Sequence, residues 1–262
     1  MVKINKVEIL KAIIKTIKYS QKYQCQLTLD ELRTRLISPK TFTKEEISKF
    51  IKLSGYKVVK LKTNKNFEEK LKKARELASK IAKKFPKILF IGVSGSVAAG
   101  QPKEDDDIDL FLITKKNCLW INRLRLRLYI YKNRIPHRKF DKEQKPDQFC
   151  FNIWMDEQDL TISSQKQNLK NAMDLILLIP VLNKNYSYER LIKANDWAKK
   201  YVAMGYMRLL RHKVPHNDTK ITRTNLKNLI VNYLVFWPQY WYMKKKIKTE
   251  EINLYRAFFH QK

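Results

Sequence analysis

The stretch ILFIGVSGSVAAGQPKEDDDIDLFLIT (88–114) decides the fold of the middle of the chain. Its first apolar run, 88–93, ends just before Gly95 and Ser96, and a second apolar run begins at Ile108 after a polar interval. Short apolar runs bounded by turn residues are typical of buried strands. The stretch therefore predicts two strands, joined by a connection that starts with a Gly-Ser turn.

The two acids around the start of the second run are the main candidates for chemistry. Alternation along a strand puts Ile108, Leu110 and Leu112 on one face, so Asp107 and Asp109 share the other. Carboxylates at this spacing lie about 6.5–7 Å apart along the strand, and they can bind one divalent cation together or one cation each. Because Mg²⁺ prefers oxygen ligands and is usually held by one or two carboxylates, the pair predicts a site for Mg²⁺ or Mn²⁺.

The turn before the acids has the features of a phosphate site. Gly95 lacks a Cβ, so its backbone can approach a ligand closely or adopt a positive φ. Ser96 offers a hydroxyl, and 96–99 has the pattern of a first helical turn that Gly100 and Pro102 end. Free N–H groups at a helix N-terminus attract anions. We expect Gly95 and Ser96 to bind phosphate groups beside the acid pair.

This arrangement resembles the signature of the DNA polymerase β-like nucleotidyltransferase superfamily, in which an apolar strand, Gly-Ser and an intervening segment precede Asp-apolar-Asp. The resemblance covers roughly residues 68–160. It implies that Gly95 and Ser96 hold the triphosphate of a nucleoside triphosphate such as ATP, and that Asp107 and Asp109 hold the metal ions. The flanks, including the terminal AFFHQK, are similar to uncharacterised bacterial nucleotidyltransferase-domain proteins.

In this superfamily a third carboxylate commonly lies on a later strand and helps to deprotonate the attacking hydroxyl. The matching strand here is FCFNIWM (149–155), which places Cys150, Asn152 and Trp154 on one face. Asn152 stands at the position of the carboxylate; its amide oxygen can coordinate a cation weakly, but it cannot act as a base. This departure bears on the rate and on activity itself. Three acids near the strand ends are alternatives that spacing does not separate: Asp147, Asp156 and Asp159.

Composition indicates either an anionic partner or a solvated basic surface. Fifty-five Lys and Arg residues against 25 Asp and Glu give a formal net charge of +30. Such a field favours polyanions, so RNA and DNA are candidate partners. The alternative is a general enrichment in lysine whose side chains only face solvent.

The cysteines and the apolar runs favour a cytoplasmic protein without a membrane span. Cys25, Cys118 and Cys150 are far apart and form no CxxC pattern, which indicates reduced thiols rather than a disulfide frame or a zinc site. The most apolar late run, 229–243, contains polar residues and falls short of the roughly 18 residues expected of a span. No N-terminal signal is expected, because lysines interrupt the apolar positions near Met1.

Residues 1–63 are expected to form a winged-helix-like domain. Amphipathic and capping patterns predict helices over 4–19, 28–36 and 43–54, and alternation over 56–62 predicts a strand. A packing or partner-docking role is one interpretation of this domain, and DNA binding is the other. In DNA binding, the third helix would enter the major groove through four residues: Lys44, Ser48, Lys49 and Lys52.

A nucleotidyltransferase core over 64–162 and a helical domain over 163–262 are expected to follow, which makes the fold class α+β with a core sheet flanked by helices. In the core, an amphipathic helix over 67–85 precedes the first strand. The segment 120–134 follows the acid strand; its Arg-Leu alternation also fits a strand, but its length and neighbours favour a helix. The aromatic residues around Pro238 are interpreted as core rather than as base-stacking groups. Helices are predicted in the C-terminal domain over 164–178 and from Ser187, Thr222 and Thr249.

The resemblance implies metal-dependent transfer of a nucleoside monophosphate from a nucleoside triphosphate to a hydroxyl of RNA, a protein or a small molecule. One alternative is a catalytically retired, basic protein that binds nucleic acid or regulates a partner, which Asn152 and the net charge favour. A toxin–antitoxin component that modifies its partner or tRNA is a third hypothesis. The base, the acceptor and the oligomeric state stay open.

Overall fold

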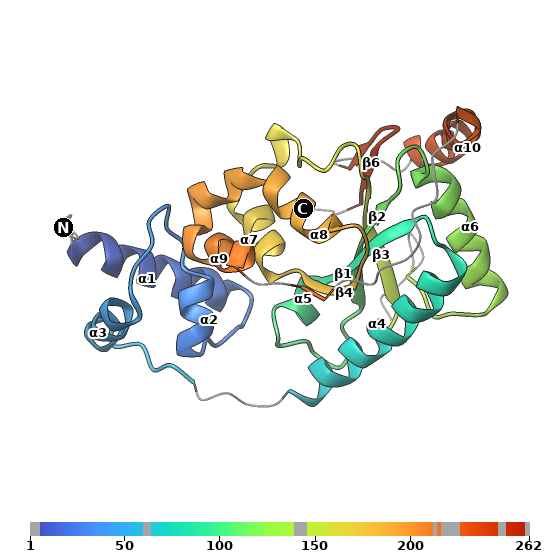
Figure 1. Cartoon of the computed structure of the whole chain (residues 1–262). Helices are drawn as coiled ribbons and strands as arrows, with labels where there is room; N and C mark the ends of the chain where they lie inside the picture. The colour runs from blue at the N-terminus through green and yellow to red at the C-terminus, as the bar shows by residue number, and fades with distance from the viewer. Residues whose placement is uncertain are drawn as a thin grey trace. The chain divides into compact units, whose positions relative to one another are not determined.

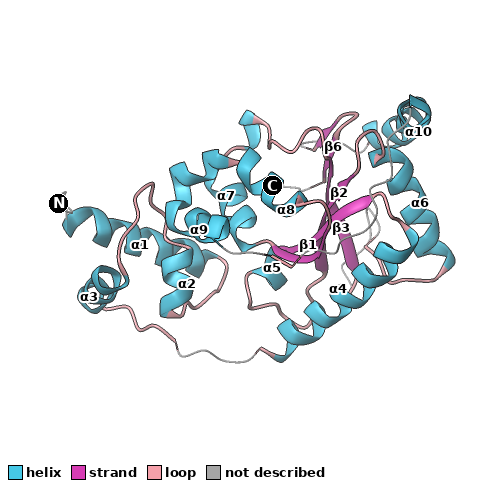
Figure 2. Ribbon diagram, viewed as in Figure 1, coloured by secondary structure: helices cyan, strands magenta, loops and turns pink. Residues whose placement is uncertain are grey.

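The computed structural model describes residues 6–59, 64–138, 146–211, 214–215, 226–245 and 250–259. Helices and a mixed sheet together make the fold α+β (Figures 1 and 2). The chain forms two compact units, which we name by their content. The helical unit consists of Met1–Thr63, Ile162–Leu177 and Ile192–Lys213, and the sheet unit consists of Asn64–Thr161, Leu178–Leu191 and Val214–Lys262.

The helical unit begins with three helices, of which the second and third have the caps that the sequence predicts. Thr28 and Thr43 each accept a hydrogen bond from the backbone N–H three residues later, and Glu31 and Glu46 accept one in return. These reciprocal bonds satisfy N–H groups that a helix start otherwise leaves without partners. The helices of this unit are α1 (Lys6–Lys22), α2 (Leu29–Thr34), α3 (Lys44–Ser54), α7 (Leu169–Leu177) and α9 (Lys199–Arg211).

The winged-helix assignment is not confirmed. Residues 56–59 form no strand, and 60–63 lie outside the described residues. Two later helices, α7 and α9, join the first three in this unit, and an isolated bridge pairs Ser38 with Val202. A role for α3 in DNA binding therefore stays a prediction.

The sheet unit contains a six-stranded sheet in the order β4-β1-β2-β3-β6-β5. The central strand β2 pairs with β1 antiparallel and with β3 parallel. This arrangement sets the start of β2 beside the end of β1 and the start of β3. The strands are β1 (Ile88–Ser94), β2 (Ile108–Thr114), β3 (Phe149–Asp156), β4 (Ile179–Asn183), β5 (Glu251–Ile252) and β6 (Arg256–Phe258).

One face of the sheet packs against long helices. The apolar stripe of α4 contributes Leu71, Leu77 and Ile81 to the same core as Ile91 of β1 and Leu110 of β2. The burial of such a stripe is what stabilises an amphipathic helix. In Figure 1, α4 and α6 lie beside the sheet and α10 lies beside α6. The helices of the sheet unit are α4 (Lys65–Lys84), the short α5 (Gly95–Ala98), α6 (Leu119–Lys132) and α10 (Leu226–Lys244). Helix α8 (Ser187–Ala194) is divided between the two units.

The prediction of one helical domain over 163–262 differs from the structure. These residues are divided between the two units, and they supply the strands β4, β5 and β6. β4 pairs with the edge of β1, and β6 pairs with the edge of β3, where the Phe259 N–H donates to the Asn152 carbonyl. The helix predicted from Thr249 is wrong for the described residues, because pairing with a distant strand edge outweighs local propensity.

The expectations for the residues of helix α10 are met only in part. Its predicted start at Thr222 lies outside the described residues, and the helix continues through Pro238. The aromatic residues around Pro238 are core only in part: Phe236 is buried and Tyr240 packs against it, whereas Trp241 and Tyr242 are 60% and 61% exposed. Within the described ranges, none of the helices combines the length and apolarity that a membrane crossing requires.

Candidate metal and nucleotide site

The connection from β1 into α5 forms the first wall of the candidate site. Gly95 opens α5 with a φ of 67°, a value that costs a residue with a Cβ about 1–2 kcal/mol. Val97 and Ala98 are buried and fix the short helix to the core, while Gly95 and Ser96 stay half-buried. The turn therefore presents its first two residues at the end of the strand.

Gly95 is also required by its neighbour. Ser94 pairs with Asp109 across β1 and β2, and a Cβ at Gly95 would overlap Asp109 Oδ2. The missing side chain thus gives the Asp109 carboxylate its place against the turn. The prediction that Gly95 and Ser96 bind phosphate stays a prediction, and their position beside the acid pair is compatible with it.

The start of β2 carries the acid pair in the register that alternation predicts. Ile108, Leu110 and Leu112 are buried in the core shared with α4, and Asp109 pairs with Ser94 on the opposite face. Asp107 is 7% exposed. Two largely shielded carboxylates at one strand end repel each other unless cations or donors neutralise them.

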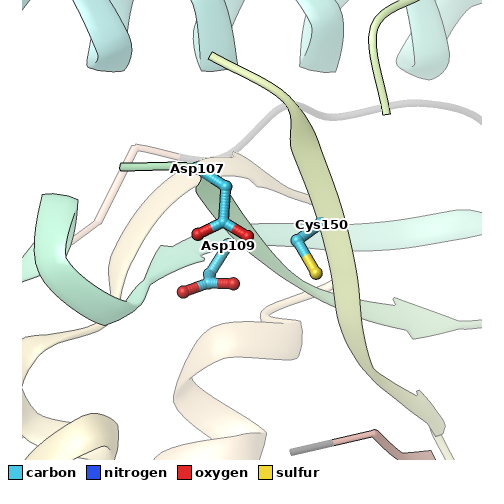
Figure 3. A group of neighbouring side chains, drawn as sticks. All are labelled: Asp107, Asp109 and Cys150. Atoms are coloured by element: carbon cyan, nitrogen blue, oxygen red, sulfur yellow. The ribbon is translucent and has the colours of Figure 1, made fainter. Parts of the chain in front are cut away.

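Cys150 completes a group of three possible ligands with this pair (Figure 3). It lies beside Asp109 in the parallel pairing of β2 and β3. One ligand atom from each of Asp107, Asp109 and Cys150 lies within 4.8 Å of the others. Burial, followed by the charges of Asp109 and Asp107, raises the pKa of the Cys150 thiol to about 12. The sequence predicted Cys150 on this strand face, but it also indicated a plain reduced thiol rather than a metal ligand, because the three cysteines are far apart in the chain.

Asn152 lies against the acid pair as its sequence position suggests. Between Leu110 and Phe111 the register of β2 with β3 shifts by one residue, and Asn152 is the extra residue. Such a bulge re-aims a side chain. The side-chain N–H of Asn152 donates to Asp109 Oδ1, and its side-chain oxygen Oδ1 accepts from the Cys150 thiol at 2.8 Å. Asn152 therefore connects two of the three possible ligands.

Arg138 brings a positive charge to the pair. Its Nη1 donates to Asp107 Oδ2 at 3.0 Å, and its side chain is 41% exposed. Burial alone would lower the pKa of this guanidinium, but the hydrogen bond and the charge of Asp107 raise it. The guanidinium offsets part of the Asp107 charge, so it would compete with a cation for that carboxylate.

Lys70 fixes the loop that leads into β2. Its ammonium is buried and donates to the carbonyl oxygens of Glu104 at 3.0 Å and Asp106 at 2.7 Å, and to Asp147 Oδ1 at 3.0 Å. Lys73 donates to the other Asp147 oxygen at 2.6 Å. Burial would raise the pKa of Asp147, but these two lysines lower it. The result is a tethered loop directly before Asp107.

Residues 76–166 match the family described as Polymerase beta, Nucleotidyltransferase. This segment is a DNA polymerase β-like nucleotidyltransferase domain. It contains β1, α5, β2, α6 and β3, and so includes the Gly95 turn, the acid pair and Asn152. No curated protein and no solved structure matches the chain.

The nucleotidyltransferase domain does not bring the three alternative acids to the pair. Asp147 is held by Lys70 and Lys73. Asp156 accepts from the backbone N–H groups of Cys118 at 3.3 Å and Gln158 at 3.2 Å. The third acid, Asp159, forms an ion pair with Arg256. Each of these carboxylates has a structural partner of its own, and a role for any of them in place of a third carboxylate stays a prediction.

Asp156 should make the nucleotidyltransferase domain less stable as the pH rises. Burial raises the pKa of this carboxyl to about 7, so the folded state holds the proton more tightly than the unfolded chain. The stabilisation is fully present below about pH 4 and is lost as the pH rises through about 7. In Asp156→Asn this contribution is absent, and the Tm difference between variant and wild type should change across this range. A Tm difference that is constant with pH would contradict the assignment.

Replacement of Arg138 by Gln should tighten cation binding at the acid pair. Removing one positive charge from Asp107 should strengthen Mn²⁺ binding by roughly two- to five-fold, because a partly exposed ion pair is worth about 0.2–1 kcal/mol. Titration calorimetry measures this change. Arg134→Gln, a matched removal of charge from an exposed position on the same segment, should leave the affinity unchanged. Weaker Mn²⁺ binding in Arg138→Gln would show that the guanidinium does not compete with the cation.

Proposed function

We propose that the chain transfers a nucleoside monophosphate from a nucleoside triphosphate, such as ATP, to a hydroxyl acceptor with the help of Mg²⁺ or Mn²⁺. The observation that carries this proposal is the convergence of Asp107 and Asp109 with the Gly95 turn inside the nucleotidyltransferase segment. RNA, a protein side chain and a small molecule are the acceptor classes. The cytoplasm is the compartment that we propose.

The residues present fit a divalent cation. Asp107 and Asp109 offer hard oxygen ligands within reach of one another, which is the donor type that Mg²⁺ and Mn²⁺ prefer. When bound, the cation supplies positive charge to the triphosphate and lowers the pKa of the acceptor hydroxyl.

The chain's own groups would bind and orient the triphosphate. The Gly95 turn would hold the phosphates beside the Asp109 carboxylate that packs against it, and Ser96 adds a hydroxyl donor at the first turn of α5. Asn152 holds Asp109 through its amide, and Lys70 holds the loop before Asp107. Fixed groups of this kind act mainly by positioning and by charge stabilisation.

A specific observation favours the second candidate, a retired enzyme that binds nucleic acid. The two acids already have protein partners, Arg138 for Asp107 and Asn152 for Asp109. By the resemblance to the superfamily, Asn152 stands where a carboxylate would accept a proton. Of the arginines on α6, Arg125 and Arg127 are exposed, so they can contact phosphates. Arg123 is buried against Gln239 and Trp120, so its role is in packing.

Incubation with each nucleoside triphosphate, labelled at the α-phosphate, tests the proposal. The mixture contains Mg²⁺ or Mn²⁺ and, in separate arms, total cellular RNA and total protein. We expect label to enter one of these fractions only when the cation is present. Absence of label from both fractions and from small molecules, together with RNA affinity that falls steeply with salt, would favour the second candidate.

Asn152→Asp separates the two candidates further. The new carboxylate would face Asp109 at hydrogen-bonding range, so the variant should be destabilised by like charge without a cation. Mn²⁺ should restore its Tm by more than it raises that of the wild type, and transfer should be retained or increased. A Tm that does not respond to Mn²⁺, with no transfer in either protein, would support the retired enzyme.

A further inference from the structure

Cys150 occupies the place next to the acid pair where a ligand to a bound cation would lie. Its sulfur is within 4.8 Å of one oxygen of Asp107 and one of Asp109. The side chain comes from β3 at the level of Asp109 on β2, and Figure 3 shows the three side chains gathered at the ends of these two strands. Backbone pairing on both sides of β2 holds their spacing.

The donor set of this group is unusual for a site that serves Mg²⁺ alone. Mg²⁺ binds oxygen and requires nearly octahedral geometry, whereas thiolate sulfur selects softer ions such as Zn²⁺ and Cd²⁺. Catalytic zinc sites typically have three protein ligands and one open position, and cysteine and carboxylate are among the residues that serve as ligands. Two carboxylates and one thiol match that number.

Asn152 and Arg138 support such a site without entering it as ligands. Before a cation binds, the Asn152 side chain accepts from the Cys150 thiol and donates to Asp109. Loss of the thiol proton on binding removes the first hydrogen bond, and the second still orients Asp109, as outer groups around metal ligands do. Two carboxylates and a thiolate exceed the charge of a divalent cation by one. Arg138, at 3.0 Å from Asp107, brings the net charge of the occupied site close to zero, although it competes with the cation for that carboxylate.

We propose that Cys150 is a third cation ligand beside Asp107 and Asp109, and that the site prefers a thiophilic divalent cation, Zn²⁺ or Cd²⁺, over Mg²⁺. This inference rests on the proposed function for the acid pair and adds the identity of its third ligand. On binding, the Cys150 S–H bond breaks, the proton leaves to solvent, and the sulfur lone pair forms the bond to the cation. The preference would make Zn²⁺ either the working cation or a tight competitor of Mg²⁺ in transfer.

Cadmium titration of the full chain tests the inference, with the thiolate-to-metal charge-transfer band in the ultraviolet as the readout. The wild type should develop the band and saturate at one equivalent. In Cys150→Ser the band should disappear and Cd²⁺ affinity should fall by about 10–100-fold or more, while Mn²⁺ affinity changes by less than about three-fold. Cys25→Ser, which removes a half-buried thiol in the helical unit, should behave as the wild type.

Competition in the wild type gives a readout that needs no variant. Cd²⁺ should displace bound Mn²⁺, observed as the free Mn²⁺ signal in electron paramagnetic resonance. Mn²⁺ binding without any charge-transfer band would overturn the thiol ligand and leave the proposed function in place. A band that persists in Cys150→Ser would assign the sulfur to another cysteine and also overturn the inference. Absence of both Mn²⁺ and Cd²⁺ binding would overturn the inference and the proposed function together.

Discussion

Asp109→Asn should abolish cation-dependent binding of nucleoside triphosphates and lower transfer by roughly 10²–10³-fold or more, and Asp107→Asn should do the same. Each change removes one of two carboxylates that we assign to the cation. The amide that replaces Asp109 remains beside Asn152 and the Gly95 turn, so the fold should persist. Titration with a triphosphate in the presence and absence of Mn²⁺ measures the loss.

The matched control for these variants is Asp105→Asn. Asp105 is exposed and lies two residues before Asp107 in the same acidic run, so its loss changes the local charge without removing a proposed ligand. It should bind triphosphate as the wild type does. Unchanged cation dependence in both Asp107→Asn and Asp109→Asn would sink the assignment of the acid pair.

Gly95→Ala should have the second largest effect, and a second glycine shows why. An alanine at position 95 would have to keep a φ of 67°, and its Cβ would overlap the Asp109 carboxylate. Gly55 has a φ of 69° but has nothing within 4 Å of the position that a Cβ would take. Both variants should lose about 1–2 kcal/mol of stability from the left-handed backbone. Only Gly95→Ala should also displace Asp109.

The measurement for Gly95→Ala and Gly55→Ala is their affinity for the triphosphate in the presence of Mn²⁺, with the Tm recorded for each variant. We expect at least a ten-fold loss in Gly95→Ala, about 1.4 kcal/mol of binding, and no change in Gly55→Ala. Equal loss in both variants would trace the effect to general destabilisation rather than to the site. Full binding by Gly95→Ala would contradict the role given to the turn.

The part of the site that sequence alone could predict is the part with a local pattern. Apolar alternation through Ile108 and Leu110 predicted the face of Asp109, and the same reasoning put Cys150, Asn152 and Trp154 on one face of the later strand. The two-residue repeat of a strand is enough to place Asp109 and Cys150. It is wrong for Trp154, which pairs with Leu112 in the core, because the bulge at Asn152 breaks the repeat.

The partners of the site had no such pattern. Arg138 lies 31 residues from Asp107 in the sequence, and the bonds of Lys70 span 34 to 77 residues. For the bonds of Lys70, the only local sign in the sequence is that a lysine stands on the apolar side of the helix α4. Long-range ion pairs form after the chain has folded, so their members look like ordinary basic residues in sequence.

The missed strands have the same explanation in backbone terms. β5 and β6 contain two and three residues, which is too short for alternation to be visible. They form because β3 offers an edge and because Arg256 binds both Asp159 and Glu251. Pairing with a distant edge decides their structure, whereas propensity around Thr249 favoured a helix.

Comparison of a nucleoside triphosphate labelled at the α-phosphate with one labelled at the γ-phosphate tests the central claim most directly. In nucleotidyl transfer, the α-phosphate moves to the acceptor hydroxyl and the γ-phosphate leaves in pyrophosphate. With Mn²⁺ or Mg²⁺ and the acceptor fraction, the wild type should give an α-labelled acceptor and γ-labelled pyrophosphate, and Asp109→Asn should give neither. An acceptor that carries the γ-label, or an α-labelled acceptor formed equally by Asp109→Asn, would contradict the account.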